Sequence, residues 1–203
     1  MMTMITRTDT DNSYAWDTIT TWYDEMGEIL ERSTTYDNGV VKDQSFASGV
    51  ITAASQNDVL NVFDWDTIVF KYDEDGDVLE KTTAYDDGTT NMAIYQDNVL
   101  AGRIVLDAQD GSGGVHDWNA KMFAYGPDGS VMISATEYDD GDELFIIYAE
   151  GEKQTSIGVD NDDSDPWLMH VTEYGGVAPV TTYYDNVADI PDPYLEYLGM
   201  MVG

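Results

Sequence analysis

Apolar and polar residues alternate over short stretches along most of the chain, which is the pattern of β-strands. The clearest example is three consecutive runs at residues 65–73, 77–85 and 89–95, separated by Glu-Asp-Gly and Asp-Asp-Gly. An Asp-Gly pair between strand-like runs is typical of a tight hairpin turn, because glycine adopts the positive φ that such turns require. The pattern therefore predicts a three-stranded antiparallel meander, to which residues 99–106 add a fourth strand.

The same pattern recurs about every fifty residues. Four tryptophans stand 49, 53 and 49 residues apart, and a tyrosine follows each of them by seven residues. These pairs are Trp16 and Tyr23, Trp65 and Tyr72, Trp118 and Tyr125, and Trp167 and Tyr174. A fixed register at this period predicts tandem copies of one supersecondary unit. We place the copies at residues 16–64, 65–117 and 118–166, with a partial copy at 167–185.

The first strand of each copy is apolar on both of its faces. In the second copy, Ile68 and Phe70 share one face, and Val69 lies on the other. Strands with this pattern are usually covered on both sides. We therefore expect both faces of the sheet to be covered at these strands.

These observations predict an all-β fold of about fourteen strands, a tandem-repeat antiparallel meander. We expect a continuous coiled or barrel-like sheet, because the incomplete fourth copy breaks the symmetry of the alternative, a four-bladed β-propeller. Near the C-terminus, Asp192-Pro193 and Gly199 bracket an apolar stretch and predict a short C-terminal helix. We interpret residues 186–203 as a tail that caps the last repeat.

The first seven residues call for a separate interpretation. They read MMTMITR and resemble the opening of the β-galactosidase α-fragment carried by cloning vectors. We interpret residues 1–7 as a vector-derived leader, which leaves residues 8–203 as a single repeat domain. Such a leader suggests recovery of the chain from an expression library, for instance a metagenomic one, and the leader lacks the apolar stretch of a secretory signal.

The charge of the chain narrows its possible partners. Its 203 residues hold 8 Lys and Arg against 40 Asp and Glu, a formal net charge of −32. A charge of this sign excludes nucleic acid as a partner, and the lack of a long apolar run excludes membrane insertion. Because 29 of the acids are Asp and 11 are Glu, the charge belongs mainly to turns. The chain has no cysteine, so disulfides, thiol nucleophiles and thiolate metal ligands are absent.

Two segments carry a family resemblance: WDTIVFKYDEDGDVLEKTTAYDDGTT and WNAKMFAYGPDGSVMISATEYDDG. They are similar to the Tyr-Asp-rich repeats of large bacterial secreted proteins of the RTX type and, more distantly, to the YD repeats of RHS-like toxins. The resemblance covers residues 16 to about 185. It implies secretion or display at the cell surface and calcium binding. The calcium-binding nonapeptide GGxGxDxUx of RTX proteins does not occur, and residues 110–117 are the nearest stretch. The calcium ligands of that family therefore do not carry over.

Acidic turns provide a second route to cation binding. Calcium takes six to eight oxygen ligands, which converging carboxylates and carbonyls supply. The candidate ligands are Asp73, Asp75, Asp77, Asp86, Asp87, Asp139, Asp140, Asp142, Asp160, Asp162 and Asp163. None of these runs completes an EF-hand. The alternative is that each turn aspartate only accepts hydrogen bonds from its own backbone.

The hypothesis that the chain is an enzyme depends on its two histidines, His116 and His170. If they meet in space, they and an aspartate such as Asp117 or Asp165 could hold zinc and activate water for ester or phosphoester hydrolysis. No HExxH or GxSxG motif or phosphate-binding loop is present. The sequence therefore identifies no catalytic residue.

The sequence thus leaves two hypotheses of function. The first is a calcium-responsive β-repeat module of a secreted bacterial protein, which is structural or adhesive or binds glycans through exposed aromatic residues. Its partners are cations and a glycan or protein surface. The alternative is a small metal-dependent hydrolase that uses the two histidines, with zinc in place of calcium.

Overall fold

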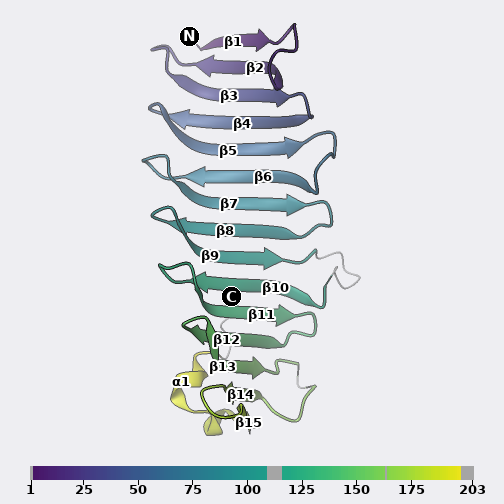
Figure 1. Cartoon of the computed structure of the whole chain (residues 1–203), viewed down its shortest axis with the longest axis vertical. Coiled ribbons are helices and arrows are strands. Elements are labelled where there is room, and N and C mark those ends of the chain that lie inside the picture. Colours follow the sequence, from purple (N-terminus) through teal and green to yellow (C-terminus); the bar gives the residue numbers. More distant parts are fainter. Residues whose placement is uncertain (1, 109–115, 163, 198–203) are drawn as a thin grey trace. The chain divides into compact units, whose positions relative to one another are not determined.

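The computed structural model describes residues 2–108, 116–162 and 164–197. These residues form 15 strands, each hydrogen-bonded to its neighbour in the chain, in one open antiparallel sheet of order β1 to β15 (Figure 1). The predicted all-β meander is therefore confirmed. The sheet does not close, so the alternative of a four-bladed propeller is not the fold.

The chain divides into two compact units, residues 1–99 (unit 1) and residues 100–203 (unit 2). The strands of unit 1 are β1 Thr3–Thr8, β2 Trp16–Tyr23, β3 Ile29–Tyr36, β4 Val40–Ala47, β5 Val50–Asp58, β6 Trp65–Tyr72, β7 Val78–Tyr85 and β8 Thr90–Gln96. Unit 2 begins within β9 Val99–Leu106 and continues with β10 Trp118–Tyr125, β11 Val131–Tyr138, β12 Glu143–Ala149, β13 Glu152–Val159, β14 Met169–Glu173 and β15 Val180–Tyr184. A 3₁₀ turn, η1 Val187–Asp189, and a short helix, α1 Asp192–Leu195, follow.

The strands follow the predicted repeat. The first strand of each full copy begins at Trp16, Trp65 or Trp118. The hairpin after it turns through a glycine of positive φ, such as Gly27 at 86° and Gly76 at 89°, a region that residues with a Cβ rarely adopt.

The strand count exceeds the expected fourteen by one, because residues of the presumed leader form a strand. β1 pairs antiparallel with β2, from Thr3 opposite Tyr23 to Thr8 opposite Thr18. All six residues of β1 are exposed, as expected for an edge strand.

The sheet has two faces, which we name by the side chains that they carry. We call the face that carries the repeat tryptophans the indole face; in unit 1 it includes Trp16, Ile19 and Thr21, which line one hollow. The other is the opposite face, since successive residues of a strand point to opposite sides. No residue of β6 is buried, so the expectation that this strand is covered on both sides is wrong. Its apolar residues pack on their neighbours within one layer.

In unit 2, the C-terminal tail covers part of the opposite face. Ile190 and Tyr197 belong to one buried cluster with Phe145, Ile157 and other residues of β11 to β14. The ring of Tyr197 meets that of Phe145 edge-on, with 5.1 Å between their centroids. In Figure 1, α1 accordingly lies beside the last strands.

The predicted C-terminal helix is present, with its cap one residue earlier than expected. Pro191 is extended and takes the N-cap position, which leaves Asp192 as the first helical residue. Gly199, the expected end of the helix, lies outside the described residues.

Candidate calcium site

Three carboxylates of unit 2 lie close together at one end of the strand pair β12 and β13. Glu143, the first residue of β12, is paired with Val159, the last residue of β13. Antiparallel pairing therefore brings Asp142, just before β12, beside Asp160, just after β13, and the loop adds Asp162. One ligand oxygen from each of these three aspartates lies within 4.8 Å of the others.

The three carboxylates differ in exposure and in pKa. Asp160 is 2% exposed, Asp142 is half-buried and Asp162 is exposed. Burial raises the pKa of Asp142 above its ordinary value, and the neighbouring charges of Asp140, Asp160 and Asp162 raise it further. Hydrogen bonds from Ser164 instead lower the pKa of Asp162. A cation among these groups would offset the repulsion between them.

Backbone hydrogen bonds hold the central carboxylate in place. Asp160 Oδ2 accepts the N–H of Asp165 at 2.9 Å, and its Oδ1 accepts those of Asp162 at 3.2 Å and Ser164 at 3.3 Å. Its orientation is therefore fixed by the loop before any ligand arrives, which lowers the entropic cost of binding. The three aspartates would supply at least three of the six to eight oxygens of a calcium ion, and carbonyls or water would complete the shell.

The triad is specific to the third copy of the repeat. By the register of the copies, the residues equivalent to Asp142 are Val40 and Thr89. The residues equivalent to Asp160 are Asp58 and Asp107, which remain acidic. Position 142 therefore distinguishes this copy from the others.

Some of the other predicted ligands cap their own turns. Asp73 Oδ1 accepts the N–H groups of Asp75 and Asp77, both at 2.9 Å, and Asp87 Oδ1 accepts the N–H of Thr89 at 2.9 Å. These bonds agree with the alternative interpretation, in which a turn aspartate accepts hydrogen bonds from its own backbone. Within the described part of the chain, Asp73, Asp75, Asp77, Asp86, Asp87, Asp139 and Asp140 join no group of three potential ligands. Asp163 lies outside the described residues.

Four aspartates share a role that was not predicted from the sequence, and each stands at the end of the strand that precedes a repeat tryptophan. In each case Oδ2 accepts the backbone N–H of the residue two positions before the tryptophan. These bonds join Tyr14 to Asp9 at 2.8 Å, Phe63 to Asp58 at 2.6 Å, His116 to Asp107 at 3.0 Å and Asp165 to Asp160 at 2.9 Å. The signal was visible, since Asp9, Asp58 and Asp160 each precede a tryptophan by seven residues.

The two histidines pack against the repeat tryptophans. His116 stacks on Trp118, with ring centroids 4.7 Å apart and planes at 10°. Tyr14 on Trp16 and Phe63 on Trp65 do the same at 5.3 Å. His116 thus occupies the stacking position of its copy.

His170 packs edge-on against the indole of Trp167, with 4.6 Å between the centroids. Burial lowers its pKa below the ordinary value, so the neutral ring is favoured. His116 precedes β10 and His170 lies in β14, four strands away, or about 19 Å at the usual strand spacing. Neither histidine belongs to a group of three metal ligands among the described residues, and Asp117 and Asp165 belong to none either.

Comparison with protein-family models and with curated proteins finds no match to this chain. The resemblance to Tyr-Asp-rich repeats therefore stays an expectation from the residues. Among the described residues, no helix has the length and apolar character needed to cross a membrane. The class that the structure defines is an open, all-β repeat sheet.

Proposed function

We propose that this chain is a calcium-responsive, non-catalytic β-repeat module of a secreted bacterial protein, with a structural, adhesive or glycan-binding role. The observation that carries the proposal is the Asp142, Asp160 and Asp162 triad, whose oxygens lie within 4.8 Å of one another. Calcium binding there would join the turn before β12 to the loop after β13. Because the ion binds only the folded arrangement, it stabilises the fold.

The use of the histidines and turn acids supports a non-catalytic role. His116 and His170 pack on indoles, and turn aspartates such as Asp73 accept hydrogen bonds from their own backbone. The two histidines on which the hydrolase hypothesis depends therefore have a structural use.

The test is a thermal melt in calcium and in chelator. At a calcium concentration of about 100 Kd, the ion should stabilise the fold by about 2.7 kcal/mol, a rise in Tm of roughly 5–10 °C. Asp142→Thr should abolish this rise and still fold, because the equivalent position in the second copy is Thr89. The matched control is Asp128→Asn, which removes an acidic charge from a turn of the same unit outside the triad.

Two results would contradict the proposal. One is an equal Tm in calcium and in chelator for the unmodified protein. The other is a calcium-dependent rise that survives in Asp142→Thr.

A further inference from the structure

The indole face of unit 1 carries a hollow of about 390 Å³. Trp16, Tyr23 and Tyr36 line it, together with Arg7 and Arg32. Its volume is in the range of small-molecule sites.

A second hollow of about 250 Å³ adjoins the first, because Tyr36 lines both. Lys42 and Trp65 line this second hollow. Among the described residues, no Asp or Glu lines either hollow. Aromatic rings, amides and basic groups thus line these two hollows, whereas a further hollow, which shares Ile5 and Tyr23 with the first, is lined by Asp24 and Glu25.

This surface concentrates the basic residues of an acidic unit. Residues 1–99 contain 20 Asp and Glu and 5 Lys and Arg, a net charge of −15. The strand register puts four of the five basic residues, Arg7, Arg32, Lys42 and Lys81, on the indole face.

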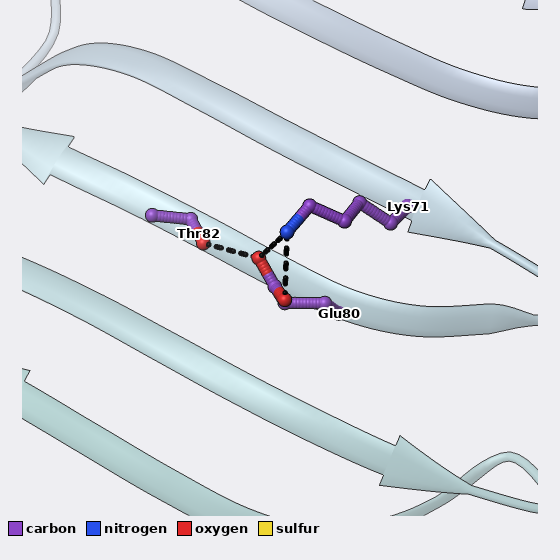
Figure 2. Close-up of polar contacts among 3 residues, drawn as sticks. All are labelled: Lys71, Glu80 and Thr82. Carbon is purple, nitrogen blue, oxygen red and sulfur yellow. Dashed lines mark hydrogen bonds and ion pairs between the residues drawn. The ribbon is translucent and has the colours of Figure 1, made fainter.

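The fifth basic residue lies on the other side of the sheet. Lys71 follows Phe70, and Phe70 pairs with Lys81, so Lys71 points to the opposite face. There it forms the ion pair with Glu80 shown in Figure 2. Among the described residues of unit 1, the pair of Lys71 and Glu80 is the ion pair formed by a basic side chain.

We propose that the indole face of unit 1 binds a short oligosaccharide that bears a carboxylate, such as a uronic-acid trimer. Arg32 pairs with the carboxylate, because a guanidinium offers two parallel N–H donors. The rings of Trp16 and Tyr36 pack on the apolar C–H faces of the sugar. Gln44, which also lines the first hollow, pairs through its amide with sugar hydroxyls.

The charge of the chain favours this ligand over a nucleic acid. A nucleic acid carries phosphates along its whole length, and a chain of net charge −32 repels it. A short oligosaccharide brings few charges, which the local basic groups can match.

Two lining residues belong to the presumed leader, namely Ile5 and Arg7. The inference therefore rests on Arg32, Trp16 and Tyr36, which belong to the repeat itself. It deepens the glycan-binding part of the proposed function and does not depend on the calcium site.

The experiment is a calorimetric titration of the full chain with trigalacturonate, in chelator, so that failure of the calcium site cannot affect the result. The unmodified protein should bind the trimer, and Arg32→Gln should weaken binding about tenfold or more. Tyr36→Ala should weaken binding as well. The matched control is Lys71→Gln, which removes the same charge from the opposite face and should leave affinity within twofold. Circular dichroism and Tm confirm that each variant folds.

Four outcomes would overturn the inference. The first is no binding of the acidic trimer by the unmodified protein. The second is equal loss in Arg32→Gln and Lys71→Gln, which would indicate a general charge effect. The third is equal affinity for the neutral galactose trimer, and the fourth is tighter binding of a single-stranded oligonucleotide than of the sugar.

Discussion

The first and third copies of the repeat share one backbone pattern and differ in what their opposite face presents. One row of directly paired residues runs across the middle of that face in each copy. In the first copy, within unit 1, the row is Thr20, Ser33, Asp43 and Ser55. In the third copy, within unit 2, the equivalent row is Met122, Ala135, Phe145 and Ile157. The same strand pairing therefore supports a polar row in one copy and an apolar row in the other.

This difference explains where the chain has a core. In unit 1, the buried apolar residues among those described are Val40 and Ala54, and the paired strands themselves hold the sheet together. In unit 2, three residues of the apolar row, Ala135, Phe145 and Ile157, are buried in one cluster with Ile190 and Tyr197 of the tail, and Met122 packs against this cluster. The repeat thus specifies strand pairing, while the composition of a face determines whether it needs a cover.

The largest expected effect comes from the buried row itself. Ile157 is 0% exposed, so Ile157→Ala should lower the free energy of unfolding by about 3 kcal/mol through lost burial and a cavity. Ser55→Ala, at the equivalent position of unit 1, should change it by less than about 0.5 kcal/mol. Amide hydrogen exchange of β13 and β5 resolves the two units separately. Equal effects of the two substitutions would show that the units do not differ in this way.

A smaller effect on stability is expected from a substitution in the C-terminal tail, which covers the buried row. Tyr197 is buried and packs edge-on against Phe145, so Tyr197→Ala should cost about 2 kcal/mol, less than the removal of a ring from the centre of a core. The control is Met26→Ala in an exposed turn of unit 1, with an effect within about 0.5 kcal/mol. Urea denaturation measures both. An unchanged midpoint for Tyr197→Ala would mean that the tail does not stabilise the sheet.

The strands and hairpin turns of this fold could be predicted from the sequence, because residues close together in the chain determine them. Glycines such as Gly27 and Gly76 fix the hairpin turns, and Trp16 and Trp65 mark the start of a copy. Treating the copies as equivalent hid the difference between their faces, since the polar Asp43 and the apolar Phe145 occupy the same place in the repeat. The expectation that both faces of the sheet are covered is therefore wrong for unit 1.

The candidate site was predictable only in part. Asp142, Asp160 and Asp162 were among eleven candidate ligands, but their proximity depends on the pairing of β12 with β13. The role of the histidines depends equally on the register. His116 and Phe63 are chemically unlike, yet both stack on the tryptophan two residues later. The spacing in the sequence establishes these offsets, whereas the contacts between the rings depend on the fold.

A pH-dependent difference between the copies is expected at Glu143, whose equivalent in the first copy is Val41. Glu143 is 3% exposed, and burial raises its pKa above 4.5, with a further contribution from Glu137. A raised folded-state pKa means that the stability from the protonated acid is present below pH 4.5 and is lost as pH rises through the folded-state value. Glu143→Gln should therefore gain stability relative to the unmodified protein between pH 4 and pH 7.

Denaturation midpoints at several pH values measure this gain. The control is Val41→Ala in the first copy, which alters no titrating group and should shift stability equally at every pH. A constant difference between Glu143→Gln and the unmodified protein would contradict the expected titration of Glu143.

The smallest expected effect is at the ion pair of Figure 2, where the second and third copies also differ. Lys71 Nζ lies 2.9 Å and 3.0 Å from the two carboxylate oxygens of Glu80, and the equivalent pair in the third copy is Ala124 and Ile133. The hydroxyl of Thr82 also donates to Glu80. The hydrogen bond from Lys71 lowers the pKa of Glu80. The stability that the ion pair contributes is therefore present above the unfolded-state pKa and is lost as pH falls through the folded-state pKa.

Because Lys71 is 60% exposed, a double-mutant cycle of Lys71→Gln and Glu80→Gln should give a coupling of only about 0.2–1 kcal/mol. The coupling should shrink in 1 M salt, where the Debye length falls to about 3 Å and exposed charges are strongly screened. Ile133→Ala, at the apolar equivalent, should show no such salt dependence. A coupling that is well above 1 kcal/mol and insensitive to salt would mean that this pair is shielded from solvent, and that unit 1 has a cover on its opposite face after all.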